Sequence, residues 1–294
     1  MKAYLKKLAL KDHQIIESHV VFTQAAPARL SDYACGIFES LPSRKSVKKA
    51  IKRGELLVNG KESETGHWVQ PGEVLKVVTR PHKLPVYQRE LECVYQDNHI
   101  AVVVKPADLP VSGFQVMNLQ NALAQNLTQS SEIDALSVPR PVHRLDRQTG
   151  GLIAIAKTRS AAASLGEQFE TRIVEKRYAA IVVGDIQGDM QLSEPIDGRE
   201  AITRVSVVKK LTHKNRGVLT LVEAEPETGR RNQIRIHLNR AGFPILGDLK
   251  FGGPHSGRGL FLFARFIRFK HPESGELLTF KMNLPGKFCR YFPK

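Results

Sequence analysis

The chain has 294 residues, of which 41% are hydrophobic and 25% charged, with 44 lysines and arginines against 29 aspartates and glutamates. No apolar run approaches the length of a membrane span, so the composition is that of a soluble globular protein and argues against a helical membrane protein. The formal net charge of +15 favours a nucleic-acid partner over an acidic membrane surface.

The three cysteines, Cys35, Cys93 and Cys289, lie far apart and form no CxxC or Cys/His group. This spacing argues against a disulfide framework and against a structural zinc site, and it fits a reducing compartment. The first twenty residues lack the long apolar segment and the small-residue cleavage site of a secretory signal. We therefore expect a cytoplasmic protein.

Residues 29–80 are predicted to form a small α+β unit after an N-terminal extension of residues 1–28. A first helix is indicated by apolar residues at helical spacing, namely Leu30, Ala34, Ile37, Phe38 and Leu41. A second helix is capped by Ser43 and ends before Gly54. Two strands follow, one before an Asn-Gly turn and one after a Pro-Gly turn.

A stripe of basic side chains follows one side of the second predicted helix. Its members recur at helical spacing and extend to both helix ends: Arg44, Lys45, Lys48, Lys49, Lys52 and Arg53. A lysine stripe is usually a solvated helix face, but here no acid intervenes before Glu55, so the stripe repels itself unless an anion lies against it. Phosphate is the natural candidate, and we predict that these six residues bind RNA.

Residues 81–90 are predicted to be a linker, and residues 91–294 a larger domain. Segments of strand composition dominate this domain: LECVYQ and HIAVVVK around an Asp-Asn turn, GLIAIAKT, RYAAIVVG, AITRVSVVKKL, GVLTLVEAEP and LFLFARFIRFKHP. SEIDALSVPR is predicted to be a loop and SAAASLGEQFETR a helix. Because the strands follow one another through turns more than through crossover helices, we expect an α+β fold with a large mixed, mainly antiparallel sheet.

The stretch PVHRLDRQTGG places one acid, Asp146, between Arg144 and Arg147 in a loop that leads into a buried strand. Two interpretations are open at this point. Asp146 either caps the local turn and pairs with a neighbouring arginine, or it is a reactive carboxylate displayed on a loop that a rigid sheet supports.

Two further stretches bear on the choice. In ETGRRNQIRIHLNRAG, a helix is predicted to end at Gly242, and Arg235 lies between two isoleucines. A buried guanidinium needs a carboxylate, and Asp146 is an attractive partner that would be kept ionised by the pair. In EKRYAAIVVG, Tyr178 begins a strand, where it is either a core-edge residue or a phenol that stacks on a base or transfers a proton.

Four motifs in this order, HRLDRQTGGLIAIAKT, EKRYAAIVVG, ETGRRNQIRIHLNRAGFPILGDLKFGG and FARFIRFKHPESGELLTF, resemble the RluA family of pseudouridine synthases. The pattern SRKSVKKAIKRGELLVNGKES followed by VQPGEVLKV resembles the ribosomal-protein-S4-like RNA-binding domain. The resemblance implies a pseudouridine-synthase-type catalytic domain after a small S4-like domain. It also implies isomerisation of uridine in structured RNA, by a monomer without a metal or organic cofactor.

The resemblance implies a role for four residues. Asp146 matches the catalytic aspartate, and Arg144 matches the arginine that fills the gap left by the flipped nucleotide. Tyr178 matches the tyrosine that stacks on the uracil and is proposed to transfer a proton. Arg235 matches the arginine that pairs with the aspartate. The chain departs from the family pattern at three positions, which usually hold Ser, His and His: Gly150, Asn232 and Phe263.

Three questions remain open on the sequence alone. The first is whether Asp146 attacks the uracil ring, attacks C1′ or assists formation of a glycal. The second is whether the RNA is ribosomal or transfer RNA. Family members that carry an S4-like domain often act on ribosomal RNA, which favours ribosomal RNA here. A non-catalytic RNA-binding or ribosome-assembly factor competes with the enzyme, whereas a nuclease or glycosidase would need a second acid near Asp146, and the loop has none.

Overall fold

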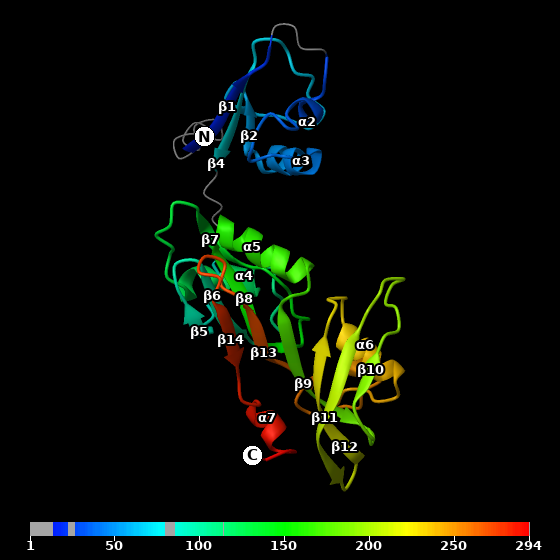
Figure 1. Ribbon diagram of the computed structural model, residues 1–294. Coiled ribbons are helices and arrows are strands. Elements are labelled where there is room, and N and C mark those ends of the chain that lie inside the picture. The colour runs from blue at the N-terminus through cyan, green and yellow to red at the C-terminus, as the bar shows by residue number, and fades with distance from the viewer. Residues whose placement is uncertain (1–13, 23–26, 80–85, 114, 294) are drawn as a thin grey trace, which may run out of the picture. The chain divides into compact units, whose positions relative to one another are not determined.

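The computed structural model describes residues 14–22, 27–79, 86–113 and 115–293, and the chain divides into two compact units between residues 83 and 84 (Figure 1). The N-terminal unit has a four-stranded antiparallel sheet in the order β1 (Gln14–Val20), β4 (Val74–Thr79), β2 (Leu56–Val58) and β3 (Lys61–Glu62). Strand β1 lies inside the segment predicted as an extension. The boundary predicted at residue 29 is therefore wrong, because the sheet recruits residues 14–20.

Two helices pack on this sheet. The second, α3 (Arg44–Arg53), is capped as predicted, since the Ser43 hydroxyl accepts from the Ser46 amide at 3.2 Å. It ends at Gly54, which has a φ of 65°. The first helix, α2 (Leu30–Tyr33), is much shorter than its apolar spacing predicts, and the chain turns at Gly36, where φ is 80°. The five apolar residues still pack into the core, because turns can bury side chains as well as a helix can.

The C-terminal unit is built on a ten-stranded sheet (Figure 1). Its main path runs β10 (Met190–Leu192), β11 (Thr203–His213), β12 (Gly217–Pro226), β9 (Glu175–Val183), β13 (Leu262–Lys270), β8 (Gly150–Thr158), β6 (Ile100–Lys105) and β5 (Glu92–Gln96). In addition, β14 (Leu277–Lys281) pairs with β13, and β7 (Ala135–Pro141) pairs with β8. The predicted α+β class with a large, mainly antiparallel sheet is confirmed.

Strand β7 corrects the prediction of a loop over SEIDALSVPR. Arg140 and Pro141 pair with β8, and the register is broken between Ala135 and Arg140. Prolines are tolerated at a sheet margin because no ladder hydrogen bond is required of their nitrogen there. The proline content that suggests a loop is therefore compatible with a short, irregular strand.

The middle of the sheet contains a parallel contact between β8 and β13, where Gly150 and Gly151 lie opposite Phe263 and Ala264. Every other strand pairing in the described residues is antiparallel. Gly151 has a φ of 124°, and a Cβ there would lie 2.2 Å from the Ala264 carbonyl oxygen. Only glycine fits this close approach. Two of the three departures from the family pattern, Gly150 and Phe263, are thus direct cross-strand neighbours.

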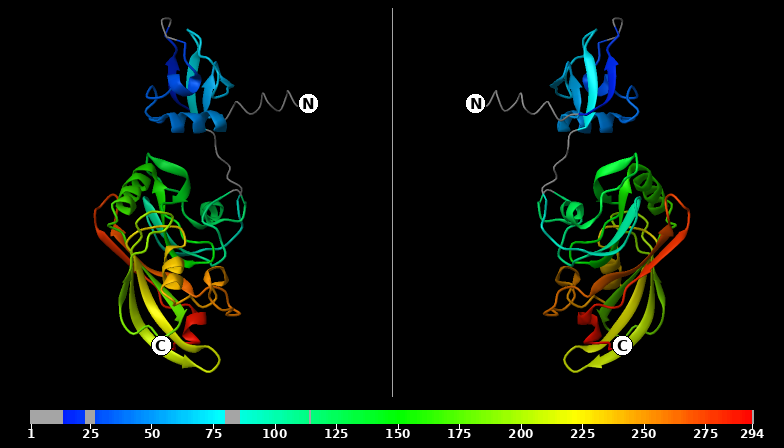
Figure 2. Two further views of the ribbon diagram at one scale, coloured as in Figure 1. Left: turned by 90° about the vertical axis from the view of Figure 1, so that its right-hand side faces the viewer. Right: turned by 90° about the vertical axis from the view of Figure 1, so that its left-hand side faces the viewer.

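The helices of this unit cover both faces of the sheet (Figure 2). They are α4 (Leu119–Asn126), α5 (Arg159–Glu170), α6 (Gln233–Arg240), the 3₁₀ turn η1 (Leu249–Phe251) and α7 (Gly286–Cys289). On β8, Ile153 and Ile155 enter one apolar core, and Leu152 and Ala154 enter the other, which also holds residues of α5. Strand β8 is therefore buried on both faces, as its uninterrupted apolar sequence predicts.

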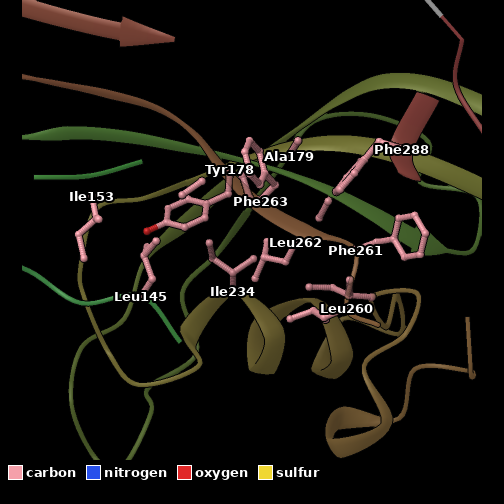
Figure 3. Close-up of a cluster of buried hydrophobic side chains, with 14 of the residues drawn as sticks. Leu145, Ile153, Tyr178, Ala179, Ile234, Leu260, Phe261, Leu262, Phe263 and Phe288 are labelled. Carbon is pink, nitrogen blue, oxygen red and sulfur yellow. The ribbon is translucent and has the colours of Figure 1, made fainter. Parts of the chain in front are cut away.

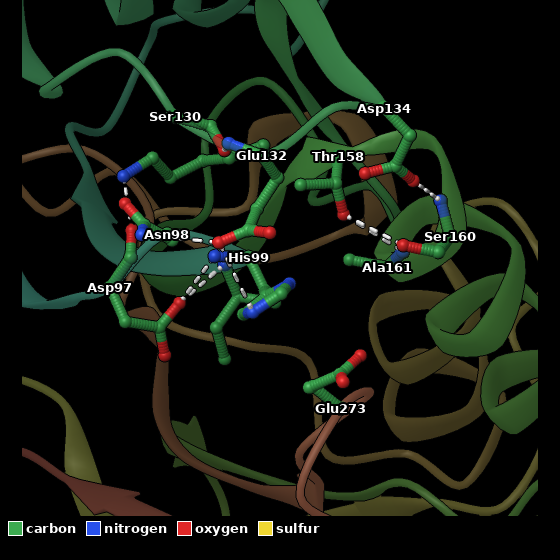
Figure 4. A network of polar contacts seen from close by, with 12 residues as sticks. Asp97, Asn98, His99, Ser130, Glu132, Asp134, Thr158, Ser160, Ala161 and Glu273 are labelled. Atoms are coloured by element: carbon green, nitrogen blue, oxygen red, sulfur yellow. Dashed lines mark hydrogen bonds and ion pairs between the residues drawn. The ribbon is translucent and has the colours of Figure 1, made fainter.

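The turn between β5 and β6 is held by a polar network (Figure 4). Asp97 Oδ1 accepts from the amides of His99 and Ile100 at 2.7 and 2.8 Å, which confirms the predicted Asp-Asn turn. Asn98 donates to Glu132 at 3.2 Å, so the turn is tied to the segment before β7.

Part of the predicted linker also belongs to this unit, because the carbonyl of Arg89 accepts hydrogen bonds from Gln125 and Asn126 of α4. No helix of the described residues is long and apolar enough to span a membrane.

Candidate active site

The loop between β7 and β8 carries Asp146, and its backbone is held from three sides. Leu145 is buried in the core, and the Thr149 amide donates to the Asp146 carbonyl at 3.0 Å. The ammonium of Lys105, at the end of β6, is fully buried and donates to the Arg147 carbonyl at 3.1 Å. It also donates to the carbonyls of Pro106 and Leu109, each at 2.8 Å. Asp146 therefore lies in a loop whose backbone is held in place by the sheet and by Lys105.

Asp146 lines two adjoining cavities, each of about 480 Å³. One of them also contains His143, Thr149, Lys176, Tyr178, Ile234 and Leu262. The other contains Asp108, Arg147, Gln148, Asn232, Arg235 and Lys250. Arg144 and Arg231 line both, and both are exposed to solvent. The structure thus brings together every residue predicted for the catalytic domain: Arg144, Asp146, Arg147, Tyr178 and Arg235.

Tyr178 forms part of the apolar floor of the first cavity, with Leu145, Ile234 and Leu262 (Figure 3). Strand β9 positions it between β13 and β12, where it pairs with Ala264 and Ala224. Burial raises the pKa of the Tyr178 phenol, and the negative charge of Asp146 raises it further. The phenol is therefore protonated at neutral pH and is a hydrogen-bond donor beside the carboxylate.

Arg235 does not pair with Asp146, and this prediction is wrong. The guanidinium forms a bidentate ion pair with Asp248, at 2.7 Å from Nε to Oδ2 and 2.6 Å from Nη2 to Oδ1. The two side chains are 4% and 1% exposed. Arg235 also donates to Asn232 at 3.0 Å and to Gln148 at 3.2 Å. The expectation that a buried guanidinium needs a carboxylate holds, but the carboxylate is that of Asp248, directly before η1, and not that of Asp146.

Gln148 links Arg235 to the loop that carries Asp146, two residues away along the chain. Arg235 therefore acts on the loop indirectly, through its hydrogen bond to that amide. Arg147 is anchored differently, because its Nε donates to the Asp108 carbonyl at 3.2 Å. Asp108, with a φ of 66°, brings a second carboxylate to the wall of the second cavity. The loop of Asp146 contains no second acid, but the fold brings Asp108 to the same cavity from a loop that is distant in the sequence.

His143 is an internal hydrogen-bond acceptor rather than a cation. Its Nε2 accepts from the Ala154 amide at 2.9 Å, and its ring stacks on Phe169 with centroids 4.6 Å apart. Burial lowers the pKa of His143 to about 3, helped by the positive charge of Lys176. The imidazole is therefore neutral at physiological pH.

Several residues of the site were not predicted from the sequence. For Lys105 a signal existed, since a lysine that interrupts the apolar run IAVVVKP must find partners. Burial lowers its pKa to about 8, and Asp108 and Asp146 oppose the shift. For Thr149 there was none: its hydroxyl is buried, lines the first cavity and has no hydrogen-bond partner in the described part of the chain. Within that part, no group of acids, histidines and cysteines has the arrangement of a metal site.

The basic stripe of the N-terminal unit lies on α3 as predicted. A groove of about 410 Å³ is lined by its members Arg44, Lys45, Lys48, Lys49 and Lys52. The two arginines at the ends have acidic neighbours, however, with Arg44 2.5 Å from Asp32 and Arg53 3.8 Å from Glu55. The self-repulsion argument therefore applies to the four lysines, which have no ion-pair partner among the described residues.

Comparison with known proteins identifies the family. A model of the RNA pseudouridylate synthase family matches residues 99–240. An uncharacterized RNA pseudouridine synthase of Bacillus subtilis is 34% identical over 266 residues, covering 83% of this chain and 86% of its own. Ribosomal large subunit pseudouridine synthase D of Pseudomonas aeruginosa is 33% identical over 293 residues, covering 88% and 89%.

Ribosomal large subunit pseudouridine synthase C of Haemophilus influenzae is 30% identical over 294 residues, covering 87% of this chain and 88% of its own. Among solved structures, human RNA pseudouridylate synthase domain containing 1 shares the fold, with a TM-score of 0.54 and 24% identity over 70% of this chain and 86% of that one. The chain therefore belongs to the RluA family of RNA pseudouridine synthases, which are isomerases.

Proposed function

We propose that this protein isomerises uridines of large-subunit ribosomal RNA to pseudouridine, with Asp146 as the catalytic carboxylate. The observation that carries the proposal is the first cavity, where Asp146 adjoins the protonated phenol of Tyr178 above an apolar floor. The choice of RNA is supported by the relatives named ribosomal large subunit pseudouridine synthases C and D.

The isomerisation requires that the uridine leave its stack. The N1–C1′ bond breaks, the uracil turns, and the ring is rejoined to the ribose through C5, which cannot happen inside a helix. Extrusion costs about a few kcal/mol, which contacts between cationic side chains and phosphates offset. Whether Asp146 attacks the ring, attacks C1′ or promotes glycal formation, the same carboxylate is used.

The remaining residues have distinct roles in the proposal. Tyr178 stacks on the flipped uracil and donates its phenolic proton when needed, and Arg144 occupies the gap in the RNA. Arg235 is a positioning residue, because it holds Gln148 of the catalytic loop through its pair with Asp248. Arg147 and the α3 stripe bind phosphates, the N-terminal unit serving as an S4-like RNA-binding domain. The enzyme acts as a monomer and uses neither a metal nor an organic cofactor.

Replacement of the carboxylate tests the assignment. Asp146→Asn is isosteric, so we expect RNA binding to persist while turnover falls by at least about 10³-fold, because the amide cannot act as nucleophile or base. Turnover is measured as tritium release from C5-labelled uridine in ribosomal RNA without added cofactor. Normal turnover by the variant contradicts the role of Asp146.

Two further measurements accompany the tritium-release assay. Mapping of pseudouridines by chemical labelling, in cells with and without the gene, identifies the target position. Absence of tritium release with any cellular RNA, together with tight RNA binding, supports the assembly-factor alternative. Because Asp108 supplies a second acid near Asp146, the products are also examined for strand breaks and abasic sites, whose appearance would indicate a nuclease or glycosidase.

A further inference from the structure

Lys176 lines the candidate active site from the strand that carries Tyr178. The two residues are two positions apart on β9, so their side chains leave the same face about 7 Å from each other. The Lys176 ammonium lies over the ring of Phe169, 5.7 Å from its centroid. A base stacked on Tyr178 would therefore share the cavity with this cation.

The Lys176 ammonium has no hydrogen-bond or ion-pair partner within the part of the chain that the structure describes. Two other cations near the site have a carboxylate partner, Arg172 in Glu200 at 2.8 Å and Arg235 in Asp248. Burial lowers the pKa of Lys176, and no carboxylate opposes that shift. Glu170 and Glu227 also line this cavity, but neither forms an ion pair with Lys176 in the described part of the chain, and a partly buried cation without a paired counter-charge is unfavourable.

The reaction develops negative charge on the uracil by every route open to Asp146. If the carboxylate adds to C6, the C5–C6 π pair moves through C4 onto O4. If C1′ is attacked, or the 2′ proton is removed to form a glycal, the N1–C1′ pair leaves with the uracil and spreads over O2 and O4. When C5 bonds to C1′, the ring supplies the bonding pair and the C5 proton is then lost to solvent. The bond from Asp146 to C6 or C1′ breaks in the same steps and frees the carboxylate, and in the glycal route the proton taken from C2′ is returned. The carbonyl oxygens are thus anionic only during the reaction.

We propose that the ammonium of Lys176 stabilises the negative charge that develops on a uracil carbonyl oxygen, which makes it a further catalytic residue. The inference rests on the proposed function. A phosphate group would be the alternative counter-charge, but phosphate is anionic before and after the reaction and would be bound equally in both states. Arg231, which is exposed at the same cavity, is available to a phosphate, whereas Lys176 is partly buried.

Neutral and charged replacements of Lys176 test the assignment, with kcat and KM measured by tritium release under single-turnover and steady-state conditions. Lys176→Met is expected to lower kcat about 10²-fold and to leave KM and the salt dependence of RNA binding unchanged, because the charge acts only in the transition state. Lys176→Arg is expected to recover at least a tenth of the wild-type kcat. Lys281→Met, which removes an exposed lysine of the same unit, is the matched control and is expected to behave as wild type.

Each other outcome overturns the proposal. A rise in KM with a smaller salt slope of binding and an unchanged kcat identifies Lys176 as a phosphate contact. Wild-type kcat in Lys176→Met shows that the charge is not used. Removal of an uncompensated cation should raise the melting temperature, so a variant that fails to fold shows that the lysine has a structural partner. Failure of the proposed function is distinguishable, because the wild-type enzyme then releases no tritium.

Discussion

His143 shows how a single residue of the catalytic loop is fixed by burial. Its ring is stacked on Phe169 and accepts the Ala154 amide proton, an interaction that only the neutral imidazole can make. The pKa of His143 is lowered from an ordinary 6.5 to about 3, so the unfolded state binds a proton in this range that the folded state does not. By linkage, the stability contributed at neutral pH is lost as the pH falls below about 6.5.

His143→Gln keeps an acceptor for the Ala154 amide and removes the titration. Between pH 7 and pH 5 the variant is expected to lose roughly 1–2 kcal/mol less stability than the wild type does. Urea unfolding of both proteins at pH 7, 6 and 5 measures this difference. Parallel losses in the two proteins would show that His143 is protonated in the folded state.

At the scale of elements, the close contact of β8 with β13 requires a glycine at position 151. Gly151→Ala places a Cβ 2.2 Å from the Ala264 carbonyl oxygen in a backbone conformation with φ of 124°. We expect destabilisation by at least about 1–3 kcal/mol and loss of turnover, because the strand that follows Asp146 must move. Thermal unfolding and tritium release are the two measurements.

Gly166→Ala is the control within the same unit. Gly166 lies in α5, no atom comes within 4 Å of the position that a Cβ would occupy there, and its φ is unexceptional. Alanine is favoured over glycine in a helix interior by up to about 1 kcal/mol, so this variant should be slightly more stable and fully active. Equal behaviour of the two variants contradicts the close approach at Gly151.

The elements that could be predicted are those whose signal is local. Helix α3 has its cap, its stripe and its terminal glycine within twelve residues, and β8 has an uninterrupted apolar run. Strand β1 pairs with β4 across more than fifty residues, and no short pattern encodes such a partner. Asp146 and Tyr178 were predicted as site residues from the order of motifs, and the structure brings them to one cavity. Asp248 was missed because any acid that the fold brings close can pair with Arg235.

At the scale of the whole molecule, the net charge of +15 is expected to make RNA binding strongly dependent on salt concentration. Four lysines of α3, at positions 45, 48, 49 and 52, have no ion-pair partner in the described ranges and are expected to contact phosphates together. Changing all four to Ala should weaken RNA binding and reduce the slope of log K against log salt by about 3, since each phosphate contact contributes about 0.7–0.9. Turnover at saturating RNA should remain within about twofold.

Filter binding over a range of salt concentrations measures the slope. Lys61→Ala, on the exposed strand β3 of the same unit, is the control and should change the slope by less than about one. An unchanged slope in the fourfold variant would assign the electrostatic contacts to the C-terminal unit alone.

Strand β8 has core on both faces and hydrogen-bonded neighbours in β6, β7 and β13, and Asp146 lies four residues before its first residue. Asp146, the proposed catalytic acid, is thereby attached to a strand that is buried on both faces. Residues 227–231, which form the facing wall, contain exposed positions and lie outside the sheet. Substitutions at these residues are therefore expected to change which RNA the cavity accepts without disturbing the backbone that holds Asp146.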